Sequence, residues 1–151
     1  MNKRLAGLGD VPVLTELRKR QLIDEGLPPV SLRMDIDREL ADYFTSAISS
    51  GTFISWIMDN GGEIIATSGV CFYALPPTYS NPSGRVAYIT NMYTKPEYRR
   101  RGIAAELLEL VIGEAKTRGY KIIRLHTSEY GKSVYSKAGF VDTDGFMALR
   151  I

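Results

Sequence analysis

The sequence has few of the residues on which several classes of protein depend. Its 151 residues include one cysteine, Cys71, and one histidine, His126. A single cysteine allows no disulfide bond within the chain, which excludes a small disulfide-stabilised fold. We also expect no bound metal, because no cluster of ligand residues stands out in the sequence.

Long hydrophobic runs are also missing. No stretch is long and apolar enough for a membrane helix, and no secretory apolar segment follows Met1. We therefore expect a cytoplasmic protein with no membrane partner. The net charge of +2 is too small to indicate a nucleic-acid partner by itself. With 44% hydrophobic and 24% charged residues, residues 1–151 have the composition of a single globular domain.

Helical periodicity is clearest in three segments, where apolar residues recur at three- and four-residue spacing. Asp10 is the expected N-cap of the first helix, which the segment EGLPP stops after about Asp24. The second helix lies between an N-cap at Asp35 or Asp37 and Gly51. The third begins after Gly102 and closes at Gly119, and a shorter fourth helix is expected over residues 131–137.

Short β-rich segments separate these helices. The segments TFISWIM and EIIATSGVCFYAL flank the turn DNGG and predict a hairpin. The strand RVAYITNMYT, the third helix and the strand KIIRLHT form a crossover unit, so these two strands should be parallel neighbours. Further strands are expected at residues 3–6, 139–142 and 146–151. The whole pattern predicts an α/β or α+β domain.

Three consecutive arginines, Arg99 to Arg101, run directly into Gly102 and the third helix. The first turn of a helix leaves four backbone N–H groups without helical partners, at the positive end of the helix dipole. Gly102 lets a ligand approach the backbone, and Ala104 and Ala105 keep the first turn open. This junction suits a diphosphate, with charge-assisted bonds from the arginine side chains as support.

The basic turn is open to other interpretations. A solvated cluster of arginines before a surface helix is the ordinary meaning of such a segment. A P-loop would need Lys-Ser/Thr after a second glycine, and a dinucleotide-binding motif would need more glycines, so neither fits. RNA binding by these arginines, with Tyr93 and Tyr98 beside them, stays open.

The strand YITNMYT, the turn KPEY and the segment RRRGIAAELL together resemble motif A of the GNAT superfamily of acyl-CoA-dependent N-acetyltransferases. That motif reads Arg/Gln-x-x-Gly-x-Gly/Ala and is matched by Arg99, Gly102 and Ala104. Downstream, SEYGKSVYSKAGF is similar to motif B of the family, matched by Tyr135, Gly139 and Phe140. The sequence departs from the family at Ser128 and Gly131, where many members have asparagine and alanine.

The resemblance implies a single GNAT-like domain, with a mixed, mostly antiparallel sheet, flanking helices and a splayed pair of parallel strands. It also implies acetyl-CoA as cosubstrate. The pantetheine arm would lie along the strand that ends near Thr94, with a polar contact from the motif B segment, and the pyrophosphate would lie on the arginine-glycine turn. The residues implied to contact the cosubstrate are Met92, Tyr93, Thr94, Arg99, Arg100, Arg101, Gly102, Ile103, Ala104, Ala105 and Ser128.

Acetyl transfer to an amine needs a base for the ammonium and a proton donor for the leaving thiolate. The motif match makes Tyr135 the candidate general acid. The base is less evident, because Asn91 stands where some family members have glutamate. His126 is a candidate because histidine is the residue type most often used as a general base; Glu25, Glu129 and ordered water are alternatives. A backbone N–H near Met92 or Tyr93 is the expected donor to the thioester carbonyl.

The predicted function is transfer of an acetyl group from acetyl-CoA to a primary amine of a small molecule or peptide, by direct attack in a ternary complex. A route through an acyl-cysteine at Cys71 is disfavoured, because nothing nearby in the sequence makes that thiol electropositive and exposed. The alternative is a non-catalytic module that holds acyl-CoA or RNA through its basic turn. The sequence does not identify the acceptor, and a homodimer stays open.

Overall fold

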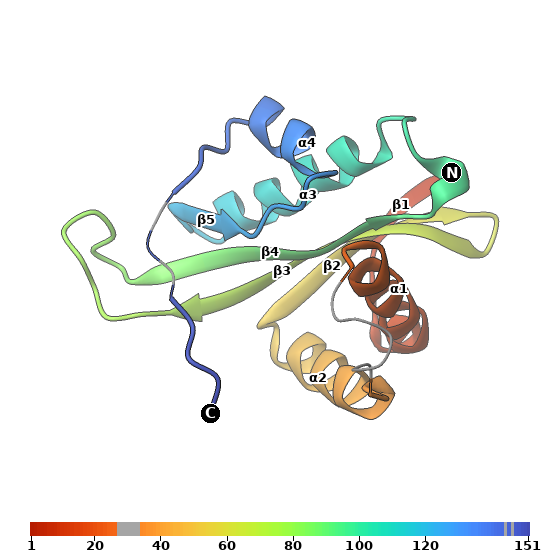
Figure 1. Ribbon diagram of the computed structural model, residues 1–151, viewed down its shortest axis with the longest axis horizontal. Coiled ribbons are helices and arrows are strands. Elements are labelled where there is room, and N and C mark those ends of the chain that lie inside the picture. Colours follow the sequence, from red (N-terminus) through yellow and green to blue (C-terminus); the bar gives the residue numbers. More distant parts are fainter. Residues whose placement is uncertain (27–33, 144, 146) are drawn as a thin grey trace.

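The computed structural model describes residues 1–26, 34–143, 145 and 147–151 (Figure 1). These residues form a five-stranded sheet in the order β1-β2-β3-β4-β5, so strands that are consecutive in sequence lie side by side. The pairs β1–β2, β2–β3 and β3–β4 are antiparallel, whereas β4 and β5 are parallel. The elements are β1 (Asn2–Leu5), η1 (Leu8–Asp10), α1 (Val11–Asp24), α2 (Asp37–Ser50), β2 (Phe53–Asn60), β3 (Glu63–Ala74), β4 (Arg85–Thr94), η3 (Pro96–Tyr98), α3 (Ile103–Thr117), β5 (Ile122–Leu125) and α4 (Lys132–Lys137).

Helices cover both faces of the sheet (Figure 1). Leu14 and Leu17 of α1 and Phe44 of α2 pack with Phe53 on one face. Leu108 of α3 packs on the opposite face, with further residues of α3 and α4. Because the middle of the sheet is covered twice, residues 64–70 of β3 are all buried, without the alternation typical of a one-sided strand. Each large side chain buried in this way contributes about 1.5–3 kcal/mol to folding.

The predicted helices, the hairpin and the parallel crossover unit are confirmed, and Gly51 ends α2 in the left-handed conformation with φ 73°. The start of α2 differs in detail. Ile36 is its N-cap residue, while the Asp35 carboxylate accepts a hydrogen bond from the Asp37 amide at 2.9 Å. The first helix ends at Asp24 as expected, but the two prolines expected to stop it lie outside the described residues.

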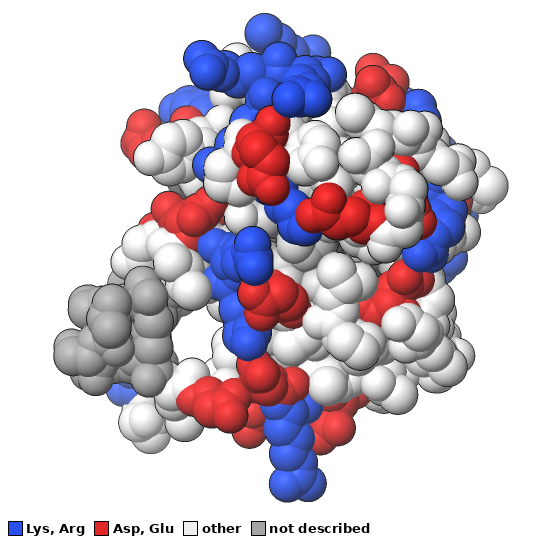
Figure 2. Space-filling model, turned by 90° about the vertical axis from the view of Figure 1, so that its right-hand side faces the viewer, with Lys and Arg blue, Asp and Glu red and all other residues white. Residues whose placement is uncertain are grey.

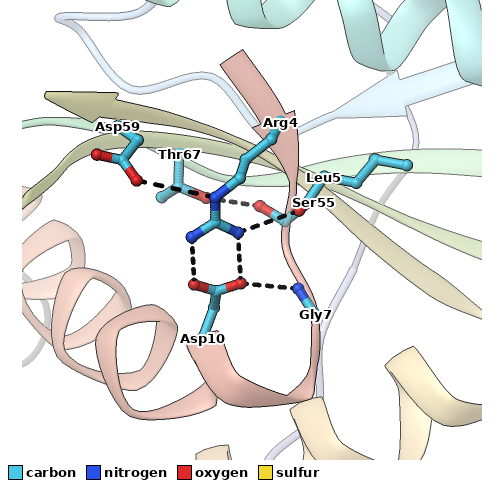
Figure 3. A network of polar contacts seen from close by, with 7 residues as sticks. All are labelled: Arg4, Leu5, Gly7, Asp10, Ser55, Asp59 and Thr67. Atoms are coloured by element: carbon cyan, nitrogen blue, oxygen red, sulfur yellow. Dashed lines mark hydrogen bonds and ion pairs between the residues drawn. The ribbon is translucent and has the colours of Figure 1, made fainter. Parts of the chain in front are cut away.

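Asp10 precedes α1 as expected, but its carboxylate does not cap that helix. It forms two hydrogen bonds with the Arg4 guanidinium, both 2.8 Å long, and accepts a third from the Gly7 amide at 2.8 Å. Figure 3 shows this arrangement, in which Arg4 also faces Asp59 of β2 at 3.8 Å. Asp10 is thus the N-cap residue of α1 as expected, but its carboxylate bonds to Arg4 because an arginine on β1 offers it stronger, charge-assisted bonds than helix amides do. The result is a link between the edge of the sheet and the start of α1.

The two strands expected after α4 are absent from the described residues. Met147, Leu149 and Ile151 alternate along the chain as in a strand, but their side chains are 100%, 88% and 118% exposed. An alternating pattern of apolar residues indicates only that a strand formed there would have one apolar face. It does not provide a neighbouring strand, and backbone groups that find none stay solvated. That expectation is therefore wrong for the described residues.

The Asp10–Arg4 pair predicts a dependence of stability on pH. The hydrogen bond with Arg4 holds the pKa of Asp10 below its ordinary value. A carboxyl group of this kind stabilises the folded state above its unfolded pKa of about 3.9, and the contribution is lost as pH falls through the folded-state pKa. Asp10→Asn should lower the free energy of unfolding at pH 7 by about 1–2 kcal/mol, because solvent screens the half-exposed arginine.

Chemical denaturation of both proteins between pH 7 and pH 2.5 measures this effect. The difference between wild type and Asp10→Asn should shrink below about pH 4. Asp42→Asn is the control, because Asp42 and Arg38 form a pair whose side chains are 74% and 89% exposed. A difference that does not change with pH would contradict the prediction.

Candidate active site

The strands β4 and β5 part within the sheet. Their parallel pairing runs from Val86–Ile122 to Ile89–Leu125, where β5 ends. β4 continues to Thr94 and stays paired with β3 on its other side. Beyond Ile89, the edge of β4 that faced β5 therefore has no strand partner among the described residues. Such an edge can pair with the amide groups of an extended ligand.

A bulge lies where the strands part. Asn91 has φ 55°, and the β3–β4 register shifts between Thr67 and Gly69. The side chain of Asn91 is 3% exposed, and its Nδ2 has no hydrogen-bond partner among the described residues. Bulges are common beside active sites, because they redirect the backbone groups that follow them. The bulge lies between the half of β4 that pairs with β5 and the segment 92–94, which was expected to contact the cosubstrate.

The arginine-glycine turn lies after the far end of β4. Gly102 is the N-cap residue of α3, with φ 80° and no side-chain capping bond. Arg100 is also left-handed, with φ 61°, which costs a residue with a side chain about 1–2 kcal/mol. The first-turn amides of α3 have no helical carbonyl to bind. The turn therefore holds a strained backbone whose open N–H groups can bind an anion.

The arginine side chains of this turn differ in their partners. Arg99 forms an ion pair with Asp24 at the end of α1, and its Nε donates to the Thr94 carbonyl at 2.9 Å. Arg101 donates to the Glu97 carbonyl at 3.0 Å. Arg100 is exposed and has no hydrogen-bond or ion-pair partner among the described residues. Of the three, Arg100 is therefore the guanidinium whose charge is most available to a phosphate.

Tyr135 of α4 lies on the sheet side of its helix and is 8% exposed. Burial raises its pKa to about 12, with the nearby charge of Glu25 adding to the rise. The phenol therefore keeps its proton throughout the neutral range. Gly131, one turn earlier, leaves room for the ring, because a Cβ there would lie 2.6 Å from Cε2 of Tyr135.

His126 follows the last residue of β5, at the mouth of the split. Its Nδ1 shares a hydrogen bond with the hydroxyl of Tyr88, and the two rings meet edge to face with centroids 5.7 Å apart. Tyr88, His126 and Tyr135 line the same hollow of about 1090 Å³. The two candidate catalytic residues, which are nine positions apart in sequence, thus share one cavity with a tyrosine of β4.

A second hollow, of about 480 Å³, adjoins His126 on the side of α1. Its lining includes Glu25, Glu129 and Ser128. Glu25 accepts a hydrogen bond from Gln21 at 3.0 Å, and the Ser128 hydroxyl oxygen accepts one from the Gly131 amide at 3.2 Å. His126 and the two alternative candidate bases are therefore in one region, and its carboxylates favour a cationic acceptor.

Cys71 lies on β3, half-buried, 3.0 Å from the hydroxyl of Tyr43. Burial raises the pKa of its thiol. A thiol that is held protonated is a poor nucleophile, which agrees with the expectation that catalysis does not pass through this cysteine.

Figure 2 shows one side of the molecule, with basic and acidic side chains alternating down its middle and a group of basic side chains at its upper edge. Charges of both signs lie close together in several ion pairs, for example Lys19–Asp37 and Arg20–Glu16. A stripe of one sign, which would track a nucleic-acid backbone, does not run across this view.

Several residues of this region were not evident from the sequence. Tyr88 was not among the candidate site residues, yet its hydroxyl contacts His126. Asp24 has a partner 75 positions away, which no local pattern indicates. The alternation along β4 could have shown that Tyr88 shares a face with Thr90, but not that the face meets the histidine after β5.

Comparisons with known proteins agree with this geometry. The profile of the acetyltransferase (GNAT) family matches residues 16–140. A crystal structure of a predicted acetyltransferase from Clostridium acetobutylicum, determined with acetyl-CoA, is 44% identical, with a TM-score of 0.92 over 99% of this chain and 95% of that one. A GCN5-related N-acetyltransferase from Ralstonia eutropha JMP134 is 26% identical, with a TM-score of 0.90 over 99% and 97% of the two chains.

The bovine thialysine N-epsilon-acetyltransferase is 34% identical over 71 residues, which are 47% of this chain and 39% of the bovine protein. The match thus spans well under half of that relative. The chain belongs to the GNAT acetyltransferase family, whose members transfer acetyl groups from acetyl-CoA. Among the described helices, none is long and apolar enough to cross a membrane.

The geometry of the arginine-glycine turn predicts that backbone amides hold a bound anion more strongly than the side-chain charge of Arg100 does. Gly102→Val should weaken acetyl-CoA binding more than tenfold, because a β-branched residue at φ 80° displaces the amides that follow. Arg100→Ala should weaken it only by about threefold, because an exposed charge is screened. Isothermal titration calorimetry with acetyl-CoA measures both effects.

Gly61→Val is the matched control. Gly61 has φ 68°, and like Gly102 it has no atom within 4 Å of an added Cβ, so the backbone strain is similar but lies in the β2–β3 turn. A larger loss of affinity for Arg100→Ala than for Gly102→Val would show that side-chain charge dominates.

Proposed function

We propose that this protein transfers the acetyl group of acetyl-CoA to a primary amine, by direct attack in a ternary complex. One observation carries the proposal. The edge of β4 that has no strand partner beyond Ile89 runs from Tyr88, which lines one hollow with Tyr135 and His126, toward the turn with open amides at the start of α3. An extended cosubstrate that follows the split would bring its diphosphate to one end and its thioester to the other.

The residues along this path fit acetyl-CoA. The amides of residues 101–105 would take the pyrophosphate, with Arg100 adding a charge, and the free edge of β4 at Met92 and Thr94 would pair with the pantetheine amides. The Arg99 guanidinium is already bound to Asp24 and to the Thr94 carbonyl. Arg99 would therefore support the cosubstrate indirectly, by holding these two neighbours in place. Acetyl-CoA supplies the thioester whose C–S bond breaks as the new N–C bond forms.

The acceptor has to lose a proton before it attacks. An alkyl ammonium has a pKa of about 10.4, so a nearby base or water must remove that proton at neutral pH. His126 is the base we propose, since it borders both hollows and its ring is oriented by Tyr88. Glu25 and Glu129 line the acceptor side and stabilise the positive charge of the amine before the transfer.

Tyr135 would donate a hydrogen bond to the leaving sulfur. Its pKa of about 12 keeps it protonated, but it exceeds the thiol pKa of about 8.5, so complete transfer to the thiolate is unfavourable at equilibrium. The phenol therefore stabilises the developing thiolate mainly through a hydrogen bond. The proton that the thiolate finally keeps comes from the acceptor nitrogen, by way of the cavity.

The names of relatives support an amine acceptor. The bovine relative acts on the ε-amino group of thialysine, according to its name, and the Ralstonia protein is named as an N-acetyltransferase. Release of coenzyme A thiol from acetyl-CoA, measured against a panel of amines, tests the proposal. Turnover of an amine with formation of its N-acetyl product is the expected result. Acetyl-CoA binding without turnover across a broad panel would favour a non-catalytic module.

Tyr135→Phe should lower the turnover number by roughly 10- to 1000-fold and change acetyl-CoA affinity little, because it removes only the donor hydroxyl. Steady-state thiol release and calorimetry measure the two quantities. Tyr120→Phe is the control, since that ring packs on Phe72 and lies outside the lining of both hollows. Unchanged turnover in Tyr135→Phe would reject this role.

Gly131→Ala should also lower turnover, because the added Cβ would overlap the Tyr135 ring and displace it. Gly131 has φ –85°, so alanine causes no backbone strain there. Gly113→Ala is the control, because an added Cβ inside α3 meets nothing within 4 Å. If Gly131→Ala kept full turnover, the packing of Tyr135 on Gly131 would not matter for catalysis.

A further inference from the structure

The α1 helix carries a row of polar side chains whose members are linked to one another. Arg18 Nη1 donates to Gln21 Oε1 at 3.1 Å, and Gln21 Nε2 donates to Glu25 Oε1 at 3.0 Å. Residues at spacings of three and four lie on the same face of a helix. Gln21 is 8% exposed, so this face of α1 packs toward the interior rather than toward solvent.

The row lies beside the two strands that carry Cys71 and Tyr88, the partner of His126. Helix α1 packs on β3 and β4. Cys71 and Tyr88 are direct neighbours on these strands, and Tyr43 of α2 reaches Cys71. Burial raises the pKa of Tyr43, Cys71 and Tyr88, whereas the charge of Arg18 lowers each of them. Arg18 therefore lies close to all three groups.

The two ends of the row carry opposite charges. Glu25 lines the hollow beside His126, where the acceptor amine is expected. Arg18 has no ion-pair partner among the described residues, and its side chain donates a hydrogen bond to the neutral Gln21. A half-buried guanidinium without a carboxylate partner is poorly compensated, because removing a charge from water costs free energy. A carboxylate on a bound molecule would supply the missing partner.

We infer that the acceptor is an amine that also bears a carboxylate, which Arg18 binds while the amine lies near Glu25 and His126. This inference rests on the proposed function. Glu25 follows Arg18 by seven positions, which is about 10 Å along the helix axis at 1.5 Å per residue. The carboxylate and the reacting amine therefore belong at opposite ends of a short chain, as in an ω-amino acid, rather than on one carbon.

Two probes of equal chain length measure the contribution of the carboxylate to kcat/KM. These are 6-aminohexanoate and hexylamine, each assayed by thiol release with acetyl-CoA. Wild type should have a kcat/KM for 6-aminohexanoate roughly 10- to 100-fold above that for hexylamine, the value of a charge-assisted hydrogen bond. Arg18→Ala should remove this preference, and Arg18→Lys should keep part of it.

The matched control is Arg20→Ala, which removes a cation of the same helix that is bound to Glu16 and lies on the exposed side. It should leave the preference unchanged. Arg18→Ala should change the acetyl-CoA affinity and the melting temperature only slightly from their wild-type values. An equal loss for both probes, or no preference in wild type, would overturn the inference while leaving the proposed acetyl transfer in place.

Binding distinguishes the two proposals if no amine is turned over. The affinity of the protein, saturated with coenzyme A, for 6-aminohexanoate is then measured by calorimetry. Saturable binding that Arg18→Ala weakens at least tenfold would support carboxylate recognition even though the proposed reaction had failed. Absence of binding, or binding that Arg18→Ala does not change, would overturn it.

Discussion

The arrangement of the site depends on the point at which β4 loses its pairing with β5. A parallel strand pair ordinarily satisfies the backbone groups along its length, and an unpaired buried group costs free energy. Here pairing stops at Ile89 and Leu125, yet β4 goes on to Thr94. The bulge at Asn91 marks the change, and the strand beyond it presents backbone groups to a ligand. The unpaired edge of β4 thus lies between Tyr88, which lines the hollow with His126 and Tyr135, and the arginine-glycine turn.

The α1 helix fixes both ends of this arrangement relative to the sheet. Its start is tied to β1 by the Asp10–Arg4 pair, and its end is tied to the arginine-glycine turn by Asp24 and Arg99. Glu25, the next residue, lines the hollow that contains His126. A helix held at both ends keeps the polar row that includes Gln21 at a fixed distance from the split. One helix and one strand would therefore position the two substrates of the proposed reaction.

Much of the fold could be predicted from the sequence, because periodicity and capping signals are local. The segments of α1, α2, α3 and β4 each show their own pattern, and motif spacing brought Tyr135 and the turn at Gly102 into one expected site. What local patterns cannot give is the partner of a side chain. Asp10 is the N-cap residue of α1 as expected, yet its carboxylate pairs with Arg4, and Arg99 was expected near phosphate but pairs with Asp24. The exposed C-terminal residues show the same limit for strands.

The pairing of Arg99 changes the physical basis of the anion site. A guanidinium that is bound to a carboxylate adds little net charge at a distance, so three consecutive arginines supply less positive potential than their number suggests. The remaining attraction comes from the N–H groups and dipole at the start of α3, which are fixed in direction and need no side-chain ordering when a ligand binds. Backbone N–H groups with fixed directions recognise the shape of a diphosphate better than mobile side-chain charges do. The strained conformation of Arg100 and the left-handed Gly102 are then the cost of holding those amides in place.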